Sequence, residues 1–177
     1  MGRRAATGYG DLMAAPSFSI RKAREEDEPF LCEMLYEAAT WRPGSRSSPE
    51  AVLSDPRIAV YITGWGRAGD EGLVAEEATG EPLGAAWYRL FPEQAHGFGF
   101  VDARTPEMTI AVRREFRGRG IGSALLEDLI ARARKRGFPA LSLSVEPENP
   151  ALQAYEGAGF RVLYTGKALT MIRDLDS

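Results

Sequence analysis

The sequence contains very few of the residues that build disulfides and metal centres. Among its 177 residues there are one cysteine and one histidine. A single thiol excludes an internal disulfide, and these two side chains are too few for a His/Cys metal cluster. We therefore predict no metal site, interpret Cys32 as a small buried apolar residue, and expect the cytoplasm as the compartment.

Long apolar runs and an excess of positive charge are absent as well. No segment approaches the ~20 consecutive apolar residues that a membrane-spanning helix requires. The chain has 22 basic and 25 acidic residues and a net charge of −3, so it creates no field that would attract nucleic acid. We therefore expect neither a membrane nor a nucleic acid among its partners.

The length of 177 residues favours one domain with a substantial core. Residues 1–16 are mostly small and polar, and they lack the apolar segment of a secretion signal. We interpret residues 1–16 as a loose N-terminal tail and residues 17–177 as a single domain.

Glycine, by contrast, is concentrated at one position where its neighbours indicate chemistry. A predicted strand at residues 108–112 is followed, after a few polar residues, by the segment Arg117-Gly118-Arg119-Gly120-Ile121-Gly122-Ser123. Its glycines let the backbone approach a ligand closely, and the helix predicted to begin there directs unpaired N–H groups towards an anion. The segment predicts a site for the pyrophosphate of a nucleotide-like ligand.

Two familiar phosphate-binding loops fit this segment poorly. A P-loop requires a lysine and then a serine or threonine after its last glycine, and no lysine is near. A Rossmann turn requires a third glycine where Ser123 stands, and an acidic residue about 20 positions later, near the apolar Phe138. A dinucleotide-binding oxidoreductase is therefore a distant alternative.

The arrangement that does fit is R-x-x-G-x-G, over residues 117–122. Together with residues 106–112, it resembles the acetyl-CoA-binding motif of the GNAT superfamily of N-acetyltransferases. A second block, Asn149-Pro150-Ala151-Leu152-Gln153-Ala154-Tyr155-Glu156-Gly157-Ala158-Gly159-Phe160, resembles the next motif of that superfamily. The two blocks have the order and separation typical of the superfamily.

The predicted elements indicate an α/β fold of the α+β type. Helices are predicted over residues 25–39, 123–136 and 150–157, with an interrupted one from residue 49 to about residue 65. A strand–helix–strand unit over residues 108–145 implies a right-handed crossover and a parallel strand pair. The resemblance adds the GNAT fold, a mixed and mostly antiparallel central sheet with a splayed parallel pair, flanked by about four helices. In that fold the pantetheine arm of the cofactor enters the gap between the splayed strands.

The resemblance implies an acetyl-CoA-dependent N-acetyltransferase. We expect transfer of the acetyl group to a primary amine of a small molecule or peptide, by direct attack in a ternary complex, because no nucleophilic triad is visible. The alternative from another class is a non-catalytic CoA-binding sensor or regulatory module. A homodimer is one open choice for the oligomeric state.

The resemblance also implies the roles of the motif residues. The turn at residues 117–123 would hold the pyrophosphate, and the backbone of residues 110–112 would pair with the pantetheine arm. The backbone N–H of Val112 would stabilise the oxyanion. Asn149 would cap the following helix and touch the cofactor. The cofactor-binding residues so implied are Ile110, Ala111, Val112, Arg117, Gly118, Arg119, Gly120, Ile121, Gly122, Ser123, Asn149 and Tyr155.

Tyr155 occupies the motif position of the usual general acid, where it would donate a proton to the departing thiolate. A tyrosine pKa near 10 and a thiol pKa near 8.5 make that donation mildly uphill, so we expect partial hydrogen bonding to suffice. The alternative is that Tyr155 packs on CoA or in the core.

Deprotonation of the amine requires a base. Glu107 begins the strand that leads to the glycine turn, at a position where many members of the superfamily carry this base. The other interpretation of Glu107 is an exposed carboxylate at a strand end, and the sequence leaves both open. His96, in a glycine-rich loop, is a minor alternative base.

The acceptor pocket falls in the least uniform segments of the superfamily. Four residues, Tyr36, Trp41, Arg42 and Trp87, are candidates for the lining, together with Phe98 and Phe100. The alternative for most of these aromatic side chains is packing in the core or in a lid.

Overall fold

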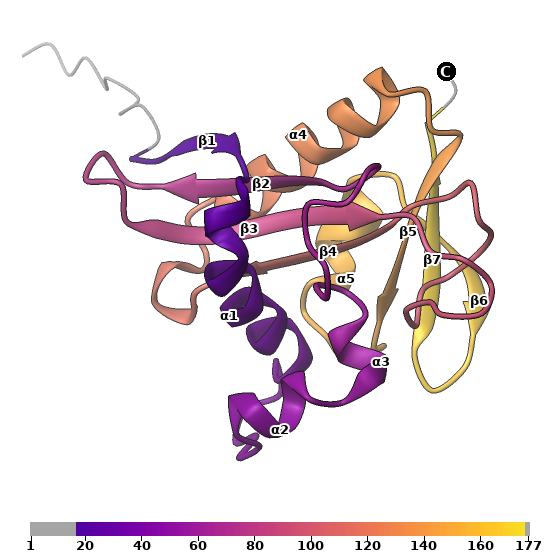
Figure 1. Ribbon diagram of the computed structural model, residues 1–177, viewed down its shortest axis with the longest axis horizontal. Helices are drawn as coiled ribbons and strands as arrows, with labels where there is room; N and C mark the ends of the chain where they lie inside the picture. The colour runs from indigo at the N-terminus through magenta and orange to yellow at the C-terminus, as the bar shows by residue number, and fades with distance from the viewer. Residues whose placement is uncertain (1–16, 176–177) are drawn as a thin grey trace, which may run out of the picture.

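The computed structural model describes residues 17–175, in which one seven-stranded sheet carries helices on both faces (Figure 1). The strands are β1 (Ser19–Lys22), β2 (Glu71–Glu76), β3 (Pro82–Arg89), β4 (Glu107–Val112), β5 (Ala140–Val145), β6 (Arg161–Thr165) and β7 (Leu169–Asp174). The α-helices are α1 (Glu28–Ala39), α2 (Pro49–Leu53), α3 (Pro56–Ala59), α4 (Ile121–Lys135) and α5 (Leu152–Gly157). None of these helices is long and apolar enough to cross a membrane. The predicted tail at residues 1–16 lies outside the described residues.

The strands are arranged in the order β1-β2-β3-β4-β5-β7-β6. Neighbouring strands are antiparallel except β4 and β5, which run parallel and share a single register pair, Glu107 with Ser142. No further residues of β4 and β5 are paired, so the two strands separate beyond this point. The predicted fold class is therefore confirmed, including the mostly antiparallel sheet and the splayed parallel pair.

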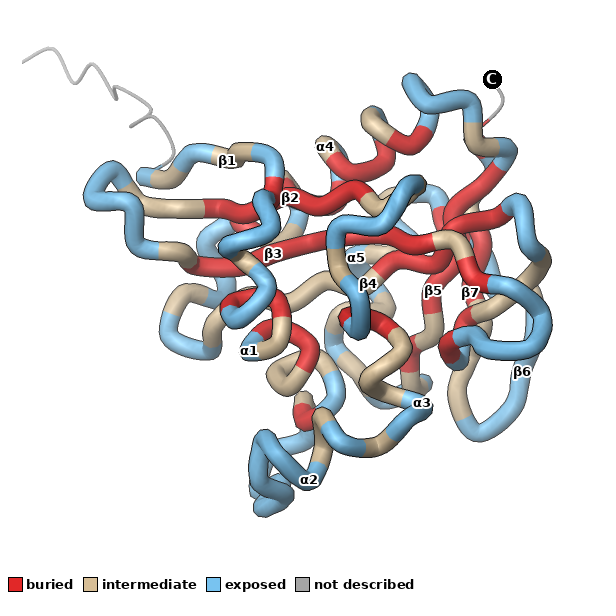
Figure 2. The backbone as a smooth tube through the Cα atoms, viewed as in Figure 1, coloured by how far each residue is buried: buried red, intermediate tan, exposed pale blue. Residues whose placement is uncertain are grey.

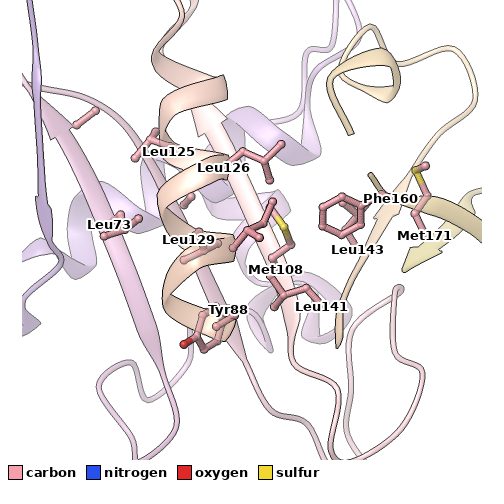
Figure 3. Packing of buried hydrophobic residues seen from close by; sticks show 14 of the residues in the cluster. Leu73, Tyr88, Met108, Leu125, Leu126, Leu129, Leu141, Leu143, Phe160 and Met171 are labelled. Carbon is pink, nitrogen blue, oxygen red and sulfur yellow. The ribbon is translucent and has the colours of Figure 1, made fainter. Parts of the chain in front are cut away.

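Two apolar clusters hold the helices against the sheet, one on each face. On one face Leu125 and Leu129 of α4 lie in one cluster with Leu141 of β5 (Figure 3). Leu152 and Tyr155 of α5 pack against the same cluster. On the other face Leu31 of α1 lies in a cluster with Trp87 of β3. Because β3 is covered from both sides, it is buried along almost its whole length, whereas β6 is mostly exposed (Figure 2).

Helix α4 has an apolar stripe along one side and a glycine at each end. Leu125, Leu129 and Ala133 follow one another at intervals of four residues and are fully buried. The helix begins after Gly120, with φ of 79°, and is followed by Gly137, with φ of 78°. Both angles lie in the left-handed region that glycine tolerates without strain. Gly137 thus takes the left-handed position that ends α4, and Gly120 takes the one at which α4 begins.

The interrupted helix predicted from residue 49 is two short helices, α2 and α3, followed by a turn. Arg89 anchors that turn, because its guanidinium donates to the carbonyl oxygens of Val60, Thr63 and Gly64 at 3.0 to 3.1 Å. The same guanidinium donates to both carboxylate oxygens of Asp70 at 3.0 and 2.9 Å. The Arg89 and Asp70 side chains are 0% and 2% exposed, so this ion pair fixes the segment after α3 to the end of β3.

Neutralising Asp70 should destabilise the protein strongly, because the Arg89 charge would stay buried without a counter-ion. We expect Asp70→Asn to lower the free energy of unfolding in urea by about 3–5 kcal/mol. The matched control is Asp174→Asn, whose partner Arg161 and whose own side chain are 58% and 63% exposed. That variant should lose less than about 1 kcal/mol. Equal losses in the two variants would contradict a stabilising role for the buried pair.

Candidate functional site

The separation of β4 from β5 leaves one edge of β4 without a strand partner. The Arg113 N–H donates to the Leu83 carbonyl oxygen at 2.9 Å, so the backbone of Arg113 faces β3. Because backbone groups of successive strand residues point to opposite sides, Ala111 also faces β3, whereas Ile110 and Val112 face the side of β5. Of the three strand residues predicted to contact the cofactor, two therefore present their backbone groups to the gap.

The glycine turn connects this edge to α4. Gly118 and Gly120 have φ of 76° and 79°, and a Cβ at either position would meet no atom within 4 Å. The first turn of α4 contains no acidic residue, and no side chain caps it. The N–H groups of Ile121, Gly122 and Ser123 have no acceptor within the helix, because they precede its first hydrogen bond. The turn is therefore an open surface lined by backbone donors, as the sequence predicts.

Two arginines flank the turn and are held by protein groups. Arg117 donates to the Val112 carbonyl oxygen at 2.9 Å and to Glu37 of α1 at 3.0 Å. Arg119 donates to the Glu115 carbonyl oxygen at 3.3 Å, and its guanidinium lies 5.1 Å from the ring centre of Phe116. Arg117 thus links the glycine turn, the end of β4 and α1.

A groove runs between α4 and α5 on the same face of the sheet. It has a volume of about 490 Å³ and is lined along α4 from Ser123 to Arg134, with Ala154 and Gly157 of α5 on the opposite side. Ser123 belongs both to the groove and to the glycine turn. A ligand bound at the turn would therefore have space to extend between the two helices.

The residues of the second motif lie around α5. The Asn149 side chain accepts from the Ala151 N–H at 2.9 Å, which orders the turn before the helix, although the N-cap residue itself is Ala151. Tyr155 packs against the cluster under α4, and its ring meets the Phe160 ring edge-on with 6.1 Å between the centres. The residue is partly exposed, and the burial of the rest of it raises the pKa of Tyr155 to about 12.

Glu107 lies on the opposite face of β4 and is 2% exposed, so it is not the exposed strand-end carboxylate of the second interpretation. Its Oε1 accepts from the Tyr61 hydroxyl and from the Gly99 N–H, the latter at 2.8 Å. Its Oε2 is buried and has no hydrogen-bond partner among the described residues, and neither has the hydroxyl of the neighbouring Ser142. Burial raises the pKa of Glu107 to about 7, which the hydrogen bonds from Tyr61 and Gly99 partly oppose.

His96, the minor alternative to Glu107, lies in the loop between β3 and β4. Its Nδ1 is 2.7 Å from the Gly97 carbonyl oxygen, so Nδ1 carries the donated proton, and its ring stacks on Phe100 with 4.2 Å between the centres. The residue is exposed, and its proximity lowers the pKa of Glu107. Of the two candidate bases, Glu107 is buried and His96 is exposed.

Three of the four residues predicted to line the acceptor pocket lie in the last turn of α1 or just after it. The Tyr36 hydroxyl donates to the Ser47 carbonyl oxygen at 2.9 Å. The Arg42 guanidinium lies 4.7 Å from the ring centre of Trp41 and pairs with Glu146 and Glu148, in the loop before α5. Arg42 therefore joins the segment after α1 to the segment after β5.

Trp87 is placed elsewhere, in the core under α1. It is 0% exposed, and its indole N–H donates to the Tyr61 carbonyl oxygen at 3.0 Å. A side chain so enclosed offers no surface to an acceptor, and its contact with Tyr61 gives it a supporting position instead.

Sequence reasoning did not identify Tyr61, Gly97, Gly99 or Ser142. Tyr61 follows α3, and its hydroxyl reaches Glu107 across 46 positions of sequence, a contact that no local pattern indicates. The length of the loop over residues 91–106 was the available signal for the two glycines, since loops of that length are often functional.

The comparisons with known proteins agree with this arrangement. The model of the acetyltransferase (GNAT) family matches residues 32–160. The chain is 36% identical over 152 residues to the L-methionine sulfoximine/L-methionine sulfone acetyltransferase of Pseudomonas paraeruginosa, with 82% of this chain and 81% of that protein covered. It is 28% identical over 163 residues to the mycothiol acetyltransferase of Rhodococcus opacus, which covers 89% of this chain and 50% of the relative. The chain thus spans about half the length of the mycothiol acetyltransferases that it matches.

A solved structure is similar over most of the chain. The structure of yncA from Salmonella typhimurium, with its cofactor acetyl-CoA, superposes with a TM-score of 0.66 at 26% identity and covers 90% of this chain and 95% of that one. The family match spans both the glycine turn and the separated strands described above. This chain belongs to the acetyltransferase (GNAT) family.

Proposed function

We propose that this protein is an acetyl-CoA-dependent N-acetyltransferase, in which a primary amine attacks the acetyl group directly in a ternary complex. The observation that carries the proposal is the separation of β4 from β5. On one face of β4 lie the glycine turn and Tyr155, and on the other lies the buried carboxylate of Glu107. Two substrates can therefore meet at the gap from opposite sides of the sheet.

The residues of the glycine turn fit the pyrophosphate of acetyl-CoA. The open space beside Gly118 and Gly120 and the unpaired N–H groups of α4 suit an anion held by the backbone. Acetyl-CoA supplies the thioester whose acetyl group is transferred. Ile110 and Val112 present backbone groups to the gap and would pair with the pantetheine arm, whereas Ala111 faces β3 and would not. The acetyl-CoA bound to yncA supports the same choice of cofactor.

Glu107 is the proposed general base. An amine of pKa near 10.4 is almost entirely protonated at neutral pH, so attack requires a proton acceptor. A carboxyl group whose pKa burial raises to about 7 is a better acceptor than an ordinary glutamate, because a base works best when its pKa lies near the working pH. Because its side chain is buried, Glu107 would take the proton through a bridging water molecule, on Oε2, the oxygen that the protein leaves without a partner.

Val112 and Tyr155 are proposed to stabilise the charges that develop on the thioester side. The Val112 N–H faces the gap and would donate to the oxyanion. Burial raises the pKa of Tyr155 to about 12, so its hydroxyl stays protonated and would serve as a hydrogen-bond donor to the departing thiolate. Because a thiol has a pKa near 8.5, this donation is partial and not a full proton transfer.

The alternative of a non-catalytic CoA-binding module is not favoured by the relatives, which are named as acetyltransferases. The Pseudomonas relative is named for an amino acid sulfoximine and sulfone, so we propose an amino-acid-sized amine as the acceptor. Tyr36, Trp41 and Arg42 are proposed to contact that acceptor. A homodimer and a cytoplasmic location stay predictions.

Acetyl-CoA and CoA should stabilise the protein against heat, whereas NADH and ATP should not. A ligand at a hundredfold excess over its dissociation constant adds about 2.7 kcal/mol, which raises the unfolding midpoint of a domain of this size by roughly 5–10 °C. Gly120→Ala should reduce this shift, because alanine resists the left-handed backbone at the turn. Gly80→Ala is the matched control, with φ of 85° and no atom within 4 Å of the added Cβ. Absence of a shift with either CoA species would contradict the proposed cofactor.

Glu107→Gln should slow acetyl transfer to a responsive amine, for example L-methionine sulfone, by about a hundredfold or more. Only the ionised carboxylate accepts a proton, so the wild-type rate should rise with pH through the Glu107 pKa of about 7 and then level off. The variant should lose this rise. Initial rates of CoA release between pH 5.5 and 8.5 measure both effects, and an unchanged pH profile in the variant would exclude Glu107 as the base.

Tyr155→Phe should lower kcat by about tenfold to a hundredfold with little change in KM for acetyl-CoA, because the hydroxyl acts on the departing thiolate. Steady-state kinetics separates this role from the alternative of packing on the cofactor, which would raise KM and leave kcat unchanged. Tyr164→Phe serves as the control, since Tyr164 is 57% exposed on β6.

A further inference from the structure

The carboxylate of Glu107 is held from one side only. Oε1 accepts two hydrogen bonds, from the Tyr61 hydroxyl and from the Gly99 N–H. The Tyr61 oxygen in turn accepts from the Phe98 N–H at 2.6 Å. Oε2 receives no bond from any described residue, although it is buried. The two oxygens of Glu107 are therefore in different environments, and within residues 17–175 Tyr61 is the only side chain that donates to either.

Tyr61 is itself fixed by several contacts. Its carbonyl oxygen accepts from the Trp87 indole at 3.0 Å, and its ring meets the Phe91 ring edge-on with 5.8 Å between the centres. The neighbouring carbonyl groups of Val60 and Thr63 are held by Arg89. A residue fixed through both its backbone and its ring keeps its hydroxyl in one position, as an orienting group requires.

The loop between β3 and β4 closes over this pair through two buried glycines. A Cβ at Gly97 would lie 2.3 Å from the Tyr61 hydroxyl oxygen and 2.5 Å from Oε2 of Glu107. A Cβ at Gly99 would lie 2.5 Å from the backbone carbonyl carbon of Leu143 in β5. Only a chain without side chains at these positions can bring the Phe98 and Gly99 N–H groups so close to Tyr61 and Glu107.

The charged and titratable groups around Glu107 come from each neighbouring element. Tyr61 faces it from the turn after α3, and His96 from the loop. Arg89 is its register partner on β3, but its guanidinium is already occupied by Asp70 and by backbone carbonyl groups. On β5 the partner is the neutral Ser142. Tyr61 is therefore the neighbouring side chain that donates directly to the carboxylate.

We propose that Tyr61 is the positioning residue of Glu107, whose hydroxyl holds Oε1 and so leaves Oε2 as the oxygen that accepts the proton. This rests on the proposed role of Glu107 as the base. In the step, an N–H bond of the acceptor ammonium breaks and its electron pair stays on nitrogen for the attack. A bridging water takes up that proton and gives one of its own to Oε2, where an O–H bond forms. Tyr61 keeps its own proton throughout, because burial and the charge of Glu107 raise the pKa of Tyr61 well above its ordinary value.

The first test measures the carboxyl group itself and needs no acceptor. In protein labelled with carbon-13 at the glutamate side chains, the Glu107 resonance is identified by its loss in Glu107→Gln and is titrated with pH. Removing a donor to the carboxylate should raise the Glu107 pKa by about one unit in Tyr61→Phe. Tyr88→Phe is the matched control, because Tyr88 is fully buried on β3 and its hydroxyl has no partner among the described residues. An unchanged Glu107 pKa in Tyr61→Phe would overturn the proposal.

A second variant preserves the test if Tyr61→Phe does not fold. Replacement of Tyr61 by 3-fluorotyrosine keeps the ring and makes the hydroxyl a stronger donor, so the Glu107 pKa should fall. In both variants the acid limb of the acetyl-transfer rate should move with the carboxyl pKa, whereas a purely structural role would lower the rate equally at every pH. A carboxyl titration that responds to both changes without acetyl transfer to any amine would refute the proposed function and leave the Tyr61–Glu107 contact established.

Discussion

The structure depends on one constraint, that β4 and β5 are paired at a single position and then separate. A parallel pair joined by a short crossover would ordinarily continue its ladder. Here pairing ends at Glu107 and Ser142, so the remaining backbone groups on that edge of β4 have no strand partner. The glycine turn and α4 follow β4 after only a few residues, and the backbone donors of the turn therefore lie near the end of the same edge. The proposed contacts to the cofactor and to the acceptor all depend on the gap that this separation leaves between β4 and β5.

On the other face of the sheet, the buried guanidinium of Arg89 binds a carboxylate and several backbone carbonyl groups. Arg89 binds Asp70 and three carbonyl oxygens, which gives the segment after α3 one position on the sheet. That segment carries Tyr61, and Tyr61 reaches Glu107. An ion pair that stabilises the fold thus also determines where the hydroxyl that contacts the proposed base is found.

The elements that depend on local pattern could be predicted from the sequence, and the contacts between distant segments could not. The helix predicted over residues 123–136 and the turn at residues 117–123 follow from local sequence pattern, and the resemblance to the GNAT superfamily implies the splayed strand pair. Trp87 was misplaced in an acceptor pocket because a strand covered on both faces shows no alternation. The burial of Glu107 and its hydrogen bond from Tyr61 depend on the packing of β4, the loop between β3 and β4, and the turn after α3. These segments are distant in the sequence, so no local pattern indicates their contact.

The two buried glycines of the loop have a consequence for how this sequence can diverge. Most positions between residues 91 and 98 are exposed, and they can change without disturbing the packing below. At Gly97 and Gly99 even a methyl group would overlap Tyr61, Glu107 or the backbone of β5. Descendants of this protein, natural or selected in the laboratory, can therefore vary the exposed positions of the loop while they retain glycine at positions 97 and 99. A mutant library built on this protein should randomise the exposed loop positions and leave these two glycines unchanged.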